Sequence, residues 1–126
     1  MIKLIFSLRR LPHLSREEFQ RYWLETHGPL VRSRAQALRI RHYIQSHTIA
    51  ASLNEALRGS RGSPEDYDGH AELWWESLTD LQEALATPEG QQASLDLLED
   101  ERRFIDLERS PLGMVEERPI IDSAHS

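Results

Sequence analysis

Histidine and tyrosine side chains supply the groups in this sequence that could move protons. His27 ends an apolar helical stripe just before a Gly-Pro pair, and its ordinary pKa of roughly 6.5 suits a general acid or base near neutral pH. A histidine at a helix end can instead satisfy the last backbone carbonyls. Tyr43 offers an O–H group for a carbonyl or enolate oxygen, or it fills an interior with its hydroxyl in water.

Two further titratable groups could assist these residues. His47 follows Tyr43 by four residues in an expected strand, which places the two side chains on one face about 13 Å apart, at ~3.3 Å per residue. They could therefore flank one bound molecule. Glu72 is a possible base, because burial in an apolar site raises a carboxyl pKa, or else a solvated partner of Arg41. The other candidates would contact a ligand: Trp23, Gln45 and Trp74.

Composition excludes several other chemistries. With 0 cysteines the chain has no thiolate metal site, iron–sulfur cluster or cysteine nucleophile, and no His/carboxylate spacing typical of a metal site is present. We therefore expect no metal and no cofactor, although haem binding through a histidine stays open. The net charge of −6 argues against a nucleic-acid partner. No apolar run is long enough to span a membrane, so we expect a cytoplasmic protein.

The elements that position these groups follow from the hydrophobic pattern. Period-two alternation predicts strands over residues 2–8, 40–49, 70–76 and 113–121. Ser15 and Glu18 have capping-box spacing for a first helix, which Gly28 should end in a left-handed cap. Residues 50–68 read as a short helix and a Gly/Ser/Pro loop that could act as a lid. Residues 1–121 should form a single domain, followed by a polar tail over 122–126.

The order strand–helix–strand, repeated once, predicts an α+β fold of the ferredoxin-like, split βαβ type. It gives a four-stranded antiparallel sheet with its helices on one face. The expected helix-side residues are Leu4, Phe6, Leu8, Ile40, Ile44, Leu73 and Trp75. The expected opposite face carries Ile5, Ser7, Tyr43, Gln45, His47, Glu72 and Trp74. Because that face is too apolar for an ordinary wet surface, we expect a second copy to cover it and enclose a ligand-binding lumen.

Three segments resemble the EthD family. Residues 19–30, Phe-Gln-Arg-Tyr-Trp-Leu-Glu-Thr-His-Gly-Pro-Leu, resemble its signature helix. Residues 67–74, Tyr-Asp-Gly-His-Ala-Glu-Leu-Trp, resemble its third-strand motif, and residues 104–110, Phe-Ile-Asp-Leu-Glu-Arg-Ser, resemble the approach to its last strand. The resemblance implies a homodimeric α+β barrel.

The resemblance also implies a range of activities. EthD-like proteins include accessory proteins of ether degradation and distant relatives of methylmuconolactone isomerase and of cofactor-free decarboxylases or cyclases. In the isomerases a helix histidine and a second-strand tyrosine belong to the active site, and these positions match His27 and Tyr43. The histidine that the isomerases carry after the second strand has no match, because residues 50–68 contain none; His47 could replace it.

Two functions are therefore expected. The first is a cofactor-free isomerase, cyclase or decarboxylase of a small hydrophobic or aromatic metabolite, with His27 moving a proton and Tyr43 stabilising negative charge on oxygen. The alternative is a non-catalytic accessory or carrier protein that serves an oxygenase pathway in the degradation of aromatic compounds.

Overall fold

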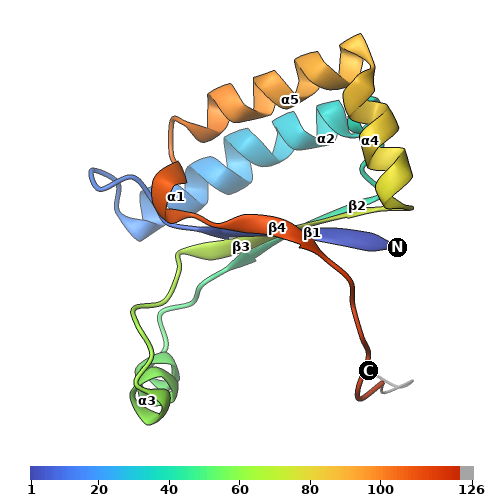
Figure 1. The fold of residues 1–126 in the computed structure, drawn as a ribbon. Coiled ribbons are helices and arrows are strands. Elements are labelled where there is room, and N and C mark those ends of the chain that lie inside the picture. Colours follow the sequence, from blue (N-terminus) through green and yellow to red (C-terminus); the bar gives the residue numbers. More distant parts are fainter. Residues whose placement is uncertain (123–126) are drawn as a thin grey trace.

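A single antiparallel sheet carries the whole fold, with most helices on one of its faces (Figure 1). The computed structural model describes residues 1–122. The elements in chain order are β1 (Ile2–Leu8), α1 (Arg16–Tyr22), the π-helical turn η1 (Trp23–His27), α2 (Gly28–Leu38), β2 (His42–His47), α3 (Ser52–Arg61), β3 (Gly69–Trp75), α4 (Leu78–Ala86), α5 (Pro88–Glu101), the 3-10 turn η2 (Leu107–Arg109) and β4 (Leu112–Val115). The strand order is β2-β3-β1-β4. The predicted α+β class, with four antiparallel strands, is confirmed.

The first helix begins as the sequence predicts. The Ser15 hydroxyl accepts a hydrogen bond from the Glu18 backbone N–H at 3.1 Å, and the Glu18 carboxylate accepts one from the Ser15 N–H at 2.9 Å. This capping box satisfies two of the backbone donors that the first turn leaves free.

The expected break at Gly28 does not occur. Gly28 is right-handed, with φ −54°, and the chain passes from α1 through η1 into α2 without leaving the helix. The Gly28 N–H bonds to the Trp23 carbonyl, five residues back. Pro29 then falls in the first turn of α2, where its missing N–H costs nothing. The π turn therefore accommodates a proline that would have ended a regular α-helix.

The core lies between the helices and the sheet, and aromatic rings form its centre. Phe19, Trp23 and Phe104 are fully buried, with Phe19 lying 5.7 Å from Trp23 and 5.5 Å from Phe104, centroid to centroid. Gly69 makes this packing possible, because a Cβ there would lie 2.4 Å from the Trp23 ring and 2.8 Å from the Ser46 carbonyl. Gly69, in the segment 67–74, is thus needed to leave room for Trp23, in the segment 19–30.

The predicted orientation of β2 is wrong. Pairing places Tyr43 opposite Leu73, Gln45 opposite Ala71 and His47 opposite Gly69, which puts all three on the helix side. Ile44, expected in the core, lies on the other face and is 51% exposed. The pattern was ambiguous because β2 has an apolar side chain in each alternating set, and a slip of one residue reverses every side chain. Ile40 precedes the strand.

The sheet face away from the main helices is uncovered in the single chain. We call it the open face; it carries Lys3, Ile5, Ser7, His42, Ile44, Ser46, His70, Glu72 and Trp74. Helix α3 and the segment after β4 both extend beyond this face (Figure 1). No residue of α3 is buried, and Leu53 and Leu57 are exposed.

Candidate functional site

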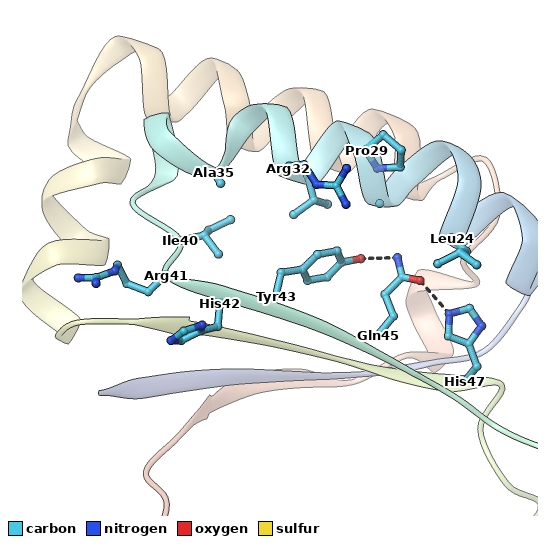
Figure 2. A pocket seen from close by; sticks show the side chains of 12 residues that line it. Leu24, Pro29, Arg32, Ala35, Ile40, Arg41, His42, Tyr43, Gln45 and His47 are labelled. Atoms are coloured by element: carbon cyan, nitrogen blue, oxygen red, sulfur yellow. Dashed lines mark hydrogen bonds between the residues drawn. The ribbon is translucent and has the colours of Figure 1, made fainter.

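A groove runs along the outer edge of the sheet, between α2 above and β2 below (Figure 2). Its volume is about 550 Å³, which is within the usual range for small-molecule sites. We call it the edge groove; it is lined by Leu24, Gly28, Pro29, Val31, Arg32, Ala35, Ile40, Arg41, His42, Tyr43, Gln45 and His47. Three predicted site residues, Tyr43, Gln45 and His47, therefore lie together, but on the helix side of the sheet. Helix α3 lies beyond the opposite face, so residues 50–68 do not form a lid over this groove.

A hydrogen-bonded chain connects the three β2 side chains. The Gln45 amide nitrogen donates to the Tyr43 hydroxyl at 2.8 Å and to the Trp23 carbonyl at 2.9 Å. The Gln45 amide oxygen lies 2.8 Å from His47 Nε2, and the His47 ring stacks on Trp23 at 4.5 Å. Gly28 leaves room for the amide, because a Cβ there would lie 3.3 Å from Gln45 Nε2.

The direction of each hydrogen bond in this chain follows from the Trp23 carbonyl. A carbonyl only accepts, so the amide nitrogen of Gln45 must face it and the amide oxygen must face His47. His47 Nε2 therefore carries the proton. The Tyr43 oxygen already accepts from Gln45, which leaves its own O–H free to donate to another group.

The pKa values of these groups keep both of them neutral near pH 7. Burial raises the pKa of Tyr43 to about 12, although the hydrogen bond from Gln45 opposes the rise. Burial also lowers the pKa of His47 below its ordinary value. In this state Tyr43 is a hydrogen-bond donor rather than a phenolate, and His47 keeps a free lone pair at Nδ1.

His27 lies in a second, interior space rather than in the groove. A cavity of about 40 Å³, which we call the inner cavity, is lined by Phe6, Leu8, Trp23, His27, Val31, Ala71, Leu73, Leu97, Glu101 and Ile105. Val31 lines both spaces, so the two are neighbours on either side of one side chain. A space of this size can hold a water molecule.

A carboxylate holds the His27 ring in place. His27 Nδ1 lies 2.7 Å from Asp100 Oδ2, and both side chains are buried. Tyr22 and Arg103 donate to the other oxygen of Asp100 at 2.5 Å and 3.1 Å. Burial alone would raise the pKa of Asp100, but these hydrogen bonds outweigh it and hold the pKa below the usual range. Asp100 is therefore charged, which assigns the His27 proton to Nδ1.

Desolvation dominates the titration of His27 itself. Burial lowers its pKa, and the hydrogen bond and charge of Asp100 only partly offset this. The ring is thus neutral near pH 7, with the Nε2 lone pair available as a base. The arrangement is that of a carboxylate-oriented histidine, which sequence reasoning could not find because Asp100 is 73 residues away.

Glu101 is a second residue that the sequence did not single out. It lines the inner cavity with His27, and burial together with the neighbouring Asp100 charge raises its pKa to about 7. Because acidic and basic residues surround it in the sequence, Glu101 has the pattern of a solvated helix end. The only signal was its place at the end of the apolar stripe of α5, next to Leu97 and Leu98.

Glu72 and Trp74 belong to neither space. Both lie on the open face, where Glu72 is 3.6 Å from Lys3 and Trp74 donates its indole N–H to Glu117 at 3.2 Å. Lys3 also lies 4.9 Å above the Trp74 ring. The expected Arg41–Glu72 pair is not formed, because Arg41 bonds to Glu76 at 3.0 Å. The structure thus separates these two candidates from Tyr43, Gln45 and His47, which the sequence had placed on the same face.

Two kinds of feature are absent from the described residues. Within residues 1–122, no three His, Asp or Glu side chains gather as a metal site would require. Over the same part of the chain, no helix has the length and apolarity needed to cross a membrane.

The strand order, the one-sided helical layer and the groove at the sheet edge define a ferredoxin-like α+β protein. Residues 11–108 match the family model described as the EthD domain. This match spans most of the chain, and the protein therefore belongs to the EthD family.

Solved structures with the same fold include proteins of three bacteria. An EthD family protein of Bacillus halodurans is 21% identical, with a TM-score of 0.61, and the match covers 94% of this chain and 99% of the other. A dimeric ferredoxin-like protein of Thermobifida fusca is 10% identical, with a TM-score of 0.55 and coverages of 90% and 88%. SnoaB, a cofactor-independent oxygenase of Streptomyces nogalater, solved as a point mutant, is 14% identical, with a TM-score of 0.51 and coverages of 97% and 97%. No curated protein matches this sequence.

Proposed function

We propose that this protein is a cofactor-free enzyme that isomerises, cyclises or decarboxylates a small hydrophobic or aromatic metabolite bound in the edge groove. The observation that carries the proposal is the Tyr43 hydroxyl, which Gln45 fixes as a free donor in a groove of ligand size. The fold is shared with SnoaB, a cofactor-independent oxygenase, and so supports chemistry that needs no cofactor.

In this mechanism two groups divide the work. The Tyr43 O–H donates to the ligand oxygen that gains negative charge, and its low acidity keeps the proton on tyrosine while the charge develops. His27 Nε2 accepts a proton from the ligand through one water in the inner cavity. The imidazolium then returns that proton to the carbon that gains it in the product, so the ring is neutral again after each turnover. Asp100 keeps the imidazole in the required tautomer and stabilises the imidazolium that forms.

The test combines ligand discovery with two conservative variants. Native mass spectrometry of protein from its own host, and a thermal-shift screen of aromatic acids and lactones, would supply the substrate. We expect His27→Asn and Tyr43→Phe each to lower kcat/KM by about 100-fold or more, as for other lost acid/base or oxyanion contacts. Full activity in both variants would refute the assignment.

A carrier or accessory function is the second candidate, and one observation favours it. His27 lies in the inner cavity, not in the groove that would hold the ligand. If the protein only binds, Tyr43→Phe should weaken binding by about 1 kcal/mol, the usual value of one hydrogen bond, and no ligand should be converted.

The open face supports a homodimer. Ile44 is 51% exposed there, beside the part-buried Trp74 and Ile5, and a dimeric protein shares the fold. Two copies that pair through this face would bury these side chains. Light scattering would report a dimer for the native chain and a monomer for Ile44→Asp; a monomeric native protein would refute this assembly.

A further inference from the structure

We propose that the edge groove selects an anion: the carboxylate form of a small apolar acid, with its charged oxygens between Arg32 and the Tyr43 hydroxyl. This inference rests on the proposed function only in taking the groove as the ligand site. It adds to that proposal the charge of the ligand and the residue, Arg32, that would bind the charged group.

The charge of the groove differs from that of the protein. The chain has 21 acidic and 15 basic side chains, yet the lining of the groove contains two arginines, two histidines and no carboxylate. A cavity with basic side chains in its lining attracts an anion, and this lining has no carboxylate that would repel one.

The two arginines are not equivalent. Arg41 is already bonded to Glu76 at 3.0 Å. Arg32, on α2, makes no ion pair with any residue of the described range 1–122, whereas the nearby Arg34 bonds to Asp96 at 3.0 Å. The Arg32 side chain extends from the helix toward the groove (Figure 2). A free guanidinium presents paired N–H donors that match the two oxygens of a carboxylate. Arg32 is therefore the group in the groove that is free to bind an anion.

The uncharged polar side chains of the groove, Tyr43 and Gln45, also favour a ligand that carries a hydrogen-bond acceptor. The Tyr43 hydroxyl accepts from Gln45 and so donates outward, and Gln45 has both ends occupied by its neighbours. A ligand that carries an oxygen acceptor would therefore find the Tyr43 O–H available to it. Among acceptors, an ionised oxygen forms the stronger hydrogen bond.

The remaining walls define the rest of the ligand. They are apolar and come from η1, α2 and the approach to β2: Leu24, Pro29, Val31, Ala35 and Ile40. A hydrocarbon ring or chain fits between them, whereas a second charged group would lose its water without finding a partner. The geometry thus defines an acid with one charged end and an apolar body.

The test compares two probes of the same shape and different charge. A naphthoate and the matching naphthamide would be titrated by calorimetry at pH 7.5 into the native chain, Arg32→Gln and Arg21→Gln, with circular dichroism melts to verify folding. We expect the native chain to bind naphthoate about tenfold more tightly than naphthamide, as a charge-assisted bidentate contact allows. Arg32→Gln should remove this preference. Arg21→Gln, which removes an exposed arginine of α1 outside the groove, should retain it as the matched control.

The outcomes separate this inference from the proposed function. Equal binding of the two probes, or a preference that survives in Arg32→Gln, would overturn the anion site while leaving the groove as a ligand site. Binding of neither probe would overturn the anion site as well. A preference that depends on Arg32, in a protein that converts no acid, would support the anion site and refute the catalytic proposal.

Discussion

The raised pKa of Glu101 predicts that stability falls as the pH rises through neutrality. Its pKa is about 7 in the folded protein against an ordinary 4.5. The difference corresponds to about 3 kcal/mol, at about 1.4 kcal/mol for each tenfold change in proton affinity. Because the folded pKa is the higher one, this contribution is complete below pH 4.5 and is lost as the pH rises through about 7.

Glu101→Gln isolates this contribution, because glutamine stays neutral at every pH. Chemical denaturation from pH 5 to pH 9 should show the native chain losing stability relative to Glu101→Gln, by about 3 kcal/mol across the range. His27 acts in the opposite sense: its lowered pKa makes stability fall as the pH falls. Because His27 is present in both the native chain and Glu101→Gln, its contribution cancels to first order in the difference between their stabilities.

The matched control is Glu99→Gln, which removes the same charge from the same helix at a side chain that is 70% exposed. It should leave the pH dependence as it is in the native chain, since exposed charges contribute little. Parallel stability curves for the native chain and Glu101→Gln would refute the reasoning. They would show that Glu101 reaches water and titrates like an ordinary carboxyl.

Three further substitutions test the packing around the site by the free energy of unfolding. Gly69→Ala should cost about 3 kcal/mol, because its Cβ would lie 2.4 Å from the Trp23 ring. The control Gly59→Ala, whose Cβ would have nothing within 4 Å, should not destabilise the protein. Equal effects of the two substitutions would contradict the packing account. Gln45→Met should cost about 2 kcal/mol, since three hydrogen bonds are lost and water replaces some of them; a neutral effect would show that the amide is not fixed. Ser15→Ala should cost about 1 kcal/mol through the lost capping box, and an unchanged unfolding midpoint would rule that out.

Local rules made most of the fold predictable. The capping box at Ser15 and the alternation in β1 and β3 each depend on neighbours in the sequence, and each is observed. The orientation of β2 was not predictable in the same way. Its side chains are of mixed polarity, and the deciding contact is the Trp23 carbonyl that receives the Gln45 amide from a different element.

The candidate site was predictable in its residue types but not in its arrangement. His27 could be named because it lies in the segment 19–30 that resembles the EthD signature helix, and Tyr43 because it falls in the expected second strand, where the isomerase relatives carry a tyrosine. Their separation into two neighbouring spaces depends on the placement of Val31 and Trp23 in the folded core. Asp100 and Glu101 could not be found because α5 packs over residues distant in the sequence, burying Asp100 and partly burying Glu101, and no local pattern reports that packing.

The π turn η1 has a consequence for the phase of the long helical segment. Phe19, Trp23, His27 and Val31 are spaced by four residues and all are buried. In a regular α-helix that spacing drifts by about 40° per step, so Val31 would face about 120° away from Phe19. The extra residue in the π turn takes up this drift and keeps the four side chains in one row. Deleting one residue from η1 would place Val31 eleven positions after Phe19, about 20° from three full turns of a regular α-helix. The π turn would then disappear, while Val31 and Arg32 would stay on the side of the groove.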